Sequence, residues 1–146
     1  MSDVLALKGS AVHSLPPEAS LMEALERMNR HRIGCFMVID SDGAPQGILS
    51  ERDILRHVAE NPAGPVSGTV RENMTPRAQL IVATEEDDLD YAMRVMTENR
   101  VRHLPVVGQG HVVGVVSIGD LLKSQLTDKE HENKMLQDYI IGRYPV

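Results

Sequence analysis

Two serine and aspartate pairs are the residues whose types and spacing most suggest chemistry. Ser50 lies three residues before Asp53, Ser117 lies three residues before Asp120, and each pair follows a glycine and two apolar residues. A serine that begins a helix lies beside free backbone N–H groups that bind anions, and an aspartate one turn later can accept hydrogen bonds from vicinal ribose hydroxyls. The same spacing also occurs in ordinary helix caps, so each pair alone has both a structural and a binding interpretation.

A second indication comes from a strand that changes character between the two halves of the chain. The segment 33–36 is apolar, whereas the equivalent segment of the second half contains Arg102 and His103. A cation inside a strand that should be buried breaks the local pattern, and such breaks cluster at functional sites. The structural alternative is an edge strand with a solvated arginine.

Other kinds of chemistry find no support in the sequence. The glycines between Gly108 and Gly114 miss the dinucleotide-binding pattern and lie in a predicted hairpin. The six histidines have no metal-ligand spacing, and no serine, histidine and aspartate set suggests a catalytic triad. Cys35, the only cysteine, lies in an apolar run and is expected to be an inert core residue. We therefore expect no metal site and no catalytic residue.

An internal repeat positions both pairs. At an offset of 68 residues Leu21 matches Leu89 and Met28 matches Met96, and at an offset of 67 Ser50 matches Ser117 and Asp53 matches Asp120. The change of offset means that the second half is one residue shorter between these two blocks of matches. Both halves have turn residues there.

Each half predicts the same order of elements. Apolar residues at spacings of three and four predict a helix from Leu21 and another from Leu89. Two short β-branched runs then predict a hairpin in each half, and Ser50 and Ser117 begin a second helix. The predicted extended segments are 12–15, 33–39 and 46–49 in the first half, and 80–83, 101–107 and 112–116 in the second. One such unit leaves an apolar sheet face exposed, so two copies are needed to close a core.

The repeat also suggests domain boundaries. We expect a first repeat with its N-terminal segment at 1–60, a linker at 61–69, a second repeat at 70–125 and a C-terminal helix or tail at 126–146. The chain from Asp120 to Ile141 contains no Gly or Pro, which predicts a long helix. The helices have more apolar positions than one small core can cover, so self-association through them is expected.

Composition limits the class of protein. The 146 residues are 42% hydrophobic and 25% charged, with a net charge of −6, which fits a soluble globular protein and disfavours nucleic-acid binding. The four aromatic residues offer few rings on which nucleic-acid bases could stack. The sequence contains neither a signal peptide nor a membrane-spanning run, and one cysteine precludes an intrachain disulfide. We expect a cytoplasmic protein without membrane contact.

Together these features resemble a known family. The two Gly-x-x-Ser-x-x-Asp motifs, the segment Met74-Thr75-Pro76 and the strand 102–107 are similar to those of tandem CBS-domain proteins, also called Bateman modules, over about residues 10–125. The pattern is closest to short stand-alone bacterial CBS pairs. The resemblance implies an α/β fold of two β-α-β-β-α repeats packed as a pseudo-twofold pair, with a C-terminal helix, and a disc-like homodimer.

The resemblance also implies two clefts, each built from both repeats. In this pattern Asp53 and Asp120 match the ribose-binding aspartate, and the segments at His13 and Ile81 present backbone amides to an adenine. The expected nucleotide-binding residues are Ser50, Arg52, Asp53, Ile81, Arg102 and His103 in one cleft, and His13, Gly34, Cys35, Ser117 and Asp120 in the other. The first set has more cations and is expected to hold phosphate more tightly, unless Arg32, Arg100 or Lys8 reaches the second cleft.

Three functions remain open at this point. The leading hypothesis is a non-catalytic regulatory module for an adenine nucleotide, AMP first, with ADP, ATP or NAD as alternatives, that acts on a protein partner. The second is a structural dimerisation or scaffold module that binds no ligand. An enzyme is the third and least supported hypothesis.

Overall fold

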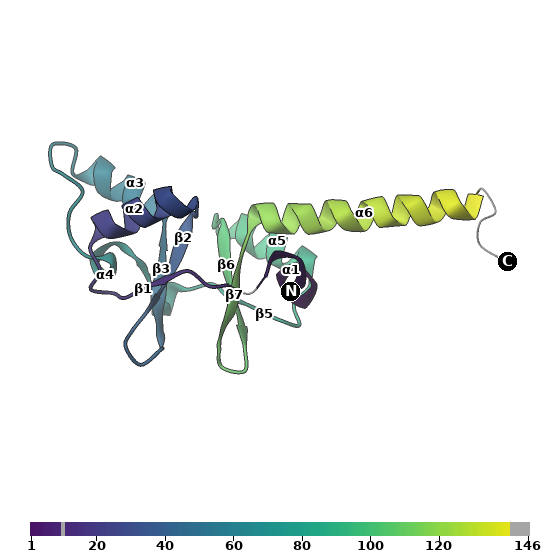
Figure 1. Ribbon diagram of the computed structural model, residues 1–146, viewed down its shortest axis with the longest axis horizontal. Helices are drawn as coiled ribbons and strands as arrows, with labels where there is room; N and C mark the ends of the chain where they lie inside the picture. Colours follow the sequence, from purple (N-terminus) through teal and green to yellow (C-terminus); the bar gives the residue numbers. More distant parts are fainter. Residues whose placement is uncertain (10, 141–146) are drawn as a thin grey trace.

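The chain forms two small sheets with helices packed on them (Figure 1). The computed structural model describes residues 1–9 and 11–140. One sheet has the strand order β1-β2-β3-β4 and the other has the order β5-β6-β7. This mixed α/β architecture with a C-terminal helix confirms the predicted fold class.

The first repeat follows the predicted order. Its elements are β1 (Ser14–Leu15), α2 (Leu21–His31), β2 (Cys35–Ile39), β3 (Pro45–Ser50) and α3 (Glu51–Glu60). β1 runs parallel to β2, and β2 pairs antiparallel with β3. The Ser20 hydroxyl caps the N-terminus of α2 by accepting a hydrogen bond from the Glu23 N–H at 3.0 Å. The apolar stripe of α2, which includes Leu21 and Met28, is buried against the sheet.

The second repeat has the same arrangement. Its elements are β5 (Ala83–Thr84), α5 (Leu89–Glu98), β6 (His103–Gly108), β7 (His111–Ser117) and α6 (Ile118–Ile140). β5 is parallel to β6, and β6 pairs antiparallel with β7. Asp88, the last of four consecutive acidic residues at 85–88, caps α5 by accepting from the Tyr91 N–H at 2.7 Å. Carboxylates at this end of α5 also complement the helix dipole.

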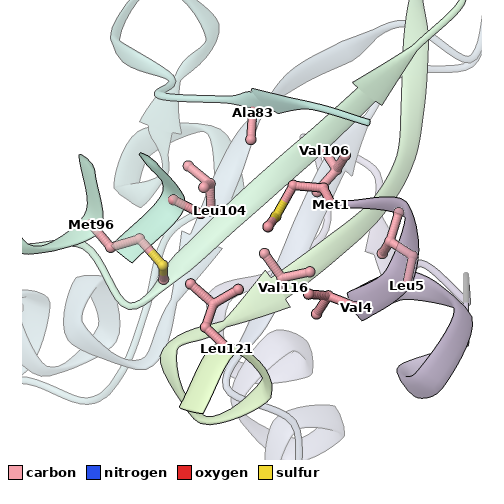
Figure 2. Packing of buried hydrophobic residues seen from close by; sticks show 10 residues of the cluster. Met1, Val4, Leu5, Ala83, Met96, Leu104, Val106, Val116 and Leu121 are labelled. Carbon is pink, nitrogen blue, oxygen red and sulfur yellow. The ribbon is translucent and has the colours of Figure 1, made fainter. Parts of the chain in front are cut away.

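The two repeats exchange their opening segments, which the sequence did not reveal. α1 (Ser2–Lys8) packs on the second repeat, where Met1, Val4 and Leu5 join the buried core (Figure 2). α4 (Val70–Asn73) and β4 (Thr75–Pro76) lie on the first repeat, followed by the short helix η1 (Arg77–Gln79). Each core is thus completed by a segment that precedes the other repeat.

This exchange explains the glycine in each Gly-x-x-Ser-x-x-Asp motif. A Cβ on Gly47 would lie 2.3 Å from the carbonyl oxygen of Thr75 in β4. A Cβ on Gly114 would lie 2.5 Å from Leu5 of α1. Both glycines permit an exchanged segment to pass close to the strand that leads to the serine.

The predicted C-terminal helix is present and projects beyond the core (Figure 1). α6 begins at Ile118, directly after Ser117, and is described to Ile140, so the expected end at Ile141 lies outside the described residues. Leu121 and Ser124 are buried, but later apolar residues of α6 are exposed. No helix in the described part of the chain combines the length and apolar character required to span a membrane.

Candidate functional site

A cleft of about 280 Å³ lies where the start of α3 faces the second repeat. Ser50, Arg52 and Asp53 line it from the first repeat. The second repeat contributes the other three expected residues, which are Ile81, Arg102 and His103. This first cleft therefore brings together all six residues grouped from the sequence, and its size is close to that of small-molecule sites.

The Ser50 and Asp53 pair is closely hydrogen bonded. Asp53 Oδ2 accepts from the Ser50 backbone N–H at 2.8 Å and from the Ser50 hydroxyl at 3.0 Å. Asp53 Oδ1 accepts from Arg56 Nη2 at 2.6 Å. Asp53 is only 4% exposed, whereas the Arg56 side chain is 58% exposed. The pair thus serves as a helix cap, and its carboxylate also belongs to the cleft lining.

Four arginines line the first cleft, and one of them, Arg56, is bonded to this carboxylate. Arg56 and Arg100 line the first cleft together with Arg52 and Arg102, although neither was among the expected site residues. Arg52 Nη1 donates a 2.8 Å hydrogen bond to the Arg100 carbonyl oxygen, which links the two repeats across the cleft. Two sequence signals were available: Arg56 lies one turn after Asp53, and Arg100 is the repeat equivalent of Arg32.

The expectation that Arg102 lies inside a buried strand is wrong. Arg102 is exposed and precedes β6, which begins at His103. The strand hydrogen bonding starts one residue later, so the Arg102 side chain stays hydrated at the cleft edge. His103 is half-buried, and it alone of the two breaks the apolar pattern of the strand.

His103 lies between the two clefts and lines both of them, as does Gly34. A Cβ on Gly34 would lie 3.0 Å from the His103 ring, so the imidazole fits closely against the glycine. Burial, followed by the positive charge of Lys8, lowers the pKa of His103. The ring therefore becomes charged only below its ordinary range near pH 6.5.

A second cleft of about 360 Å³ lies on the other side of His103. Ser117, His13, Gly34 and Cys35 line it as expected. Two cations also line it, Lys8 from α1 and Arg32, so two of the three residues considered as possible additions do reach it. Arg100 lies in the first cleft.

Asp120 is not part of the lining of the second cleft, and its carboxylate is already engaged. Its Oδ2 accepts from the Ser117 N–H at 2.7 Å, from the Ser117 hydroxyl at 2.9 Å and from Lys8 Nζ at 2.7 Å. Partial burial opposes ionisation, but the Lys8 and Ser117 hydrogen bonds outweigh it and lower the pKa of Asp120.

The expectation that Cys35 is a core residue is wrong, because it is half-buried and lines the second cleft. Its surroundings nevertheless disfavour a nucleophilic role. Burial raises the pKa of its thiol to about 12, so the thiolate is scarce at neutral pH. Among the described residues no cluster of His, Cys, Asp or Glu has the arrangement to hold a metal ion. A wider hollow of about 840 Å³, beside the β6–β7 hairpin, contains neither serine and aspartate pair, and it adjoins the first cleft at Leu80 and Pro105.

Known proteins match this arrangement over nearly the whole chain. The model of the CBS domain matches residues 6–60 and 69–127. An Arabidopsis thaliana protein described as CBS domain-containing protein CBSX3, mitochondrial, is 32% identical over 99% of this chain and 73% of its own length.

Two solved structures of CBS-domain proteins have a similar fold. A CBS-domain containing protein from Agrobacterium tumefaciens has a TM-score of 0.80 and 35% identity, covering 85% of this chain and 91% of that one. A CBS domain protein from Pyrobaculum aerophilum, complexed with AMP, has a TM-score of 0.70 and 30% identity, covering 82% and 87%. The chain therefore belongs to the CBS domain family, as a pair of CBS repeats in one short protein.

Proposed function

We propose that this chain is a non-catalytic regulatory module that binds an adenine nucleotide in the first cleft, with AMP as the leading ligand. The observation that carries the proposal is the meeting of Ser50 and Asp53 from one repeat with Arg102 and His103 from the other. A ligand there contacts both repeats at once, so its binding can change how they sit together.

The first cleft offers a separate partner for each part of a nucleotide. The Asp53 carboxylate is an acceptor for ribose hydroxyls once the exposed Arg56 guanidinium returns to water. Arg52 and Arg102 are planar donors that suit phosphate oxygens. The backbone at Ile81 lies in the same lining, where it can meet an adenine edge.

The relative with bound nucleotide supports the choice of ligand. The Pyrobaculum aerophilum protein was solved with AMP. ADP, ATP and NAD share its adenosine unit and remain alternatives. The choice among them depends on how many phosphates the arginines can accommodate.

A scaffold module without a ligand is the second candidate function. It is favoured by the cap role of both serines, since Ser50 and Ser117 each bond their aspartate inside the helix start. Under that alternative the cations of the first cleft are hydrated surface groups. We also propose, as the sequence suggested, a cytoplasmic homodimer that acts on a protein partner.

Thermal unfolding with a panel of nucleotides tests the proposal. At 100 times its dissociation constant, a ligand that binds only the folded chain stabilises it by about 2.7 kcal/mol. We expect AMP to raise the melting temperature and adenosine to do so less at equal concentration. No shift with AMP, ADP, ATP or NAD would favour the scaffold, and turnover of a bound nucleotide would favour an enzyme.

A further inference from the structure

Lys8 is bonded to Asp120, the residue that the family resemblance matches to a ribose-binding aspartate. Its Nζ donates to Asp120 Oδ2 at 2.7 Å and to the Val115 carbonyl oxygen at 2.6 Å. Both acceptors belong to β7 and the helix start after it, so the ammonium bridges the end of the strand and the motif aspartate. An ion pair with a charge-assisted hydrogen bond is stronger than a contact with a neutral hydroxyl.

The Lys8 contact differs from the one that Arg56 makes in the first cleft. Arg56 extends from the surface of α3, and its side chain is 58% exposed. Lys8 is 35% exposed and ends α1, which is anchored in the second core by Val4 and Leu5. Arg56 can therefore swing away by rotation of its side chain, whereas Lys8 is held near Asp120 by a packed helix.

We infer that Lys8 is a specificity-determining residue that closes the second cleft to ribose, so that one chain binds one AMP, in the first cleft. The inference rests on the proposed function. It also explains why the two clefts should differ in AMP affinity, and this reason does not depend on how many cations line each cleft. The second cleft has cations of its own, Lys8 and Arg32, but it has lost its free carboxylate.

Calorimetric titration with AMP tests this role. The wild-type chain should bind one AMP, and Lys8→Met, which keeps most of the apolar stem, should bind two. Adding Asp120→Ala to Lys8→Met should abolish the second site. Lys134→Met, which removes an exposed lysine of α6, is the matched control and should bind one AMP.

The possible failures can be told apart. Two AMP per wild-type chain, or a single AMP in Lys8→Met, would overturn the role of Lys8 while leaving the proposed function intact. Weaker binding in Lys8→Met would show that the ammonium holds phosphate and does not exclude ribose. An absence of AMP binding in both chains would overturn the proposed function itself.

A second, independent observation concerns the projecting part of α6. From residue 126 onward nearly all described side chains are exposed, including Leu126, Leu136 and Ile140 at 63%, 60% and 78%. Isolated helices shorter than about 12–15 residues are marginal in water. A projecting helix with large exposed apolar residues is consistent with burial against a partner.

The spacing of these residues fits a coiled coil. Leu122, Leu126, Lys129, Asn133, Leu136 and Ile140 recur at alternating intervals of four and three residues. Leu136 then occupies a d position and Ile140 an a position, the combination that favours two parallel strands. Asn133 at an a position is a polar residue of the kind that fixes register.

We also infer that this part of α6 pairs in parallel with α6 of a second copy of the chain. An antiparallel pair that keeps the leucine contacts would place Glu130 against Glu130 of the second copy, and Glu132 against its own equivalent. The parallel pair avoids both repulsions, although it sets Lys129 against Lys129 of the second copy at a d position. It also sets Asn133 against Asn133 of the second copy at an a position, whereas the antiparallel pair would set Asn133 against Lys129. The facing asparagines therefore select the parallel orientation.

Disulfide trapping tests the pairing. Ile140→Cys should link two chains rapidly under mild oxidation, because facing a positions bring their Cα atoms within bonding range. Met135→Cys, on the outward side of the predicted coil, is the control and should link slowly. The wild-type chain gives the background from Cys35, whose thiol stays protonated.

Two results would overturn the parallel pair. The first is linkage of Ile140→Cys at the rate of Met135→Cys. The second is linkage in a mixture of Leu122→Cys and Ile140→Cys chains that exceeds linkage within either variant alone, which would indicate an antiparallel pair. Ile140 is exposed at the end of the described helix, so the substitution does not threaten the fold.

Discussion

Asp53 combines a capping role with a position in the first cleft. Its Oδ2 completes the start of α3 through Ser50, while its Oδ1 accepts a hydrogen bond from the exposed Arg56. The two roles have different energetic consequences, because a cap stabilises the fold and a ligand contact stabilises the complex. Substitution can therefore separate them.

Asp53→Ala should weaken AMP binding about ten- to a hundredfold, since a hydrogen bond to a charged group contributes roughly 1.5–3 kcal/mol. The loss of the cap should lower the unfolding free energy by only ~1 kcal/mol. Thermal unfolding and AMP titration of the same variant measure the two effects. A variant that melts earlier yet binds AMP normally would support the cap alone.

The arginines of the first cleft should recognise the phosphate. Arg52→Ala/Arg102→Ala should weaken AMP binding strongly and adenosine binding little, and it should remove most of the salt dependence of AMP affinity. Arg30→Ala, a substitution of an exposed arginine on α2, is the control. Equal losses for AMP and adenosine would show that the two arginines act on the cleft shape.

His103 should make stability depend on pH. Its pKa is lower in the folded chain than the ordinary value of about 6.5, so below pH 6.5 the unfolded chain binds the proton first and the unfolding free energy falls. His103→Gln should flatten this fall between pH 7 and 5, and exposed His131→Gln should not. The charged groups acting on the ring are Lys8, Glu51, Asp120 and Arg102.

The pH window separates His103 from Asp120. The pKa of Asp120 is lowered from 3.8, so its contribution to stability is present above that pH and is lost only in stronger acid. A fall in stability near pH 6 that persists in His103→Gln would contradict the assignment to this imidazole.

At the scale of elements, α1 is expected to be a structural part of the second repeat. Leu5 is 8% exposed in that core, whereas Leu7 on the same helix is 66% exposed. Leu5→Ala should lower the unfolding free energy by about 2–5 kcal/mol, and Leu7→Ala by less than about 0.5 kcal/mol. Denaturant unfolding of both variants measures the difference, and equal small losses would show that α1 does not stabilise the core.

The sequence predicted those elements whose signals are local. Apolar spacing located α2 and α5, and the turns between β2 and β3 and between β6 and β7 were recognisable from their residues. The exchange of α1 and α4 could not be predicted, because it depends on contacts such as Leu5 with Gly114, more than a hundred residues apart. The sequence of a short helix does not indicate on which sheet the helix packs.

The same distinction applies to the site. The motif repeats and the family resemblance grouped six residues for the first cleft, all of which line it, and five for the second, of which four line it. Arg56 and Arg100 in the first cleft were missed. The bond between Lys8 and Asp120 was not predicted, because it follows from where α1 docks. Arg102 was misplaced because β6 begins at His103, two residues later than the predicted start at Val101.

At the scale of the whole molecule, the clefts lie between two repeats that also share their opening segments. Arg52 reaches the Arg100 carbonyl across the first cleft, and Lys8 reaches Asp120 beside the second from a helix that precedes the first repeat. A ligand that changes either contact acts on both repeats together. This coupling is the physical basis that we propose for regulation.

Calorimetric titration of the wild-type chain with AMP tests the central claim most directly. We predict saturable binding with a stoichiometry of one AMP per chain, weakened by salt because the phosphate meets arginines. Asp53→Ala should lose most of the affinity under the same conditions. An absence of heat and of competition at millimolar AMP, in protein shown to be folded and free of bound nucleotide, would contradict the account.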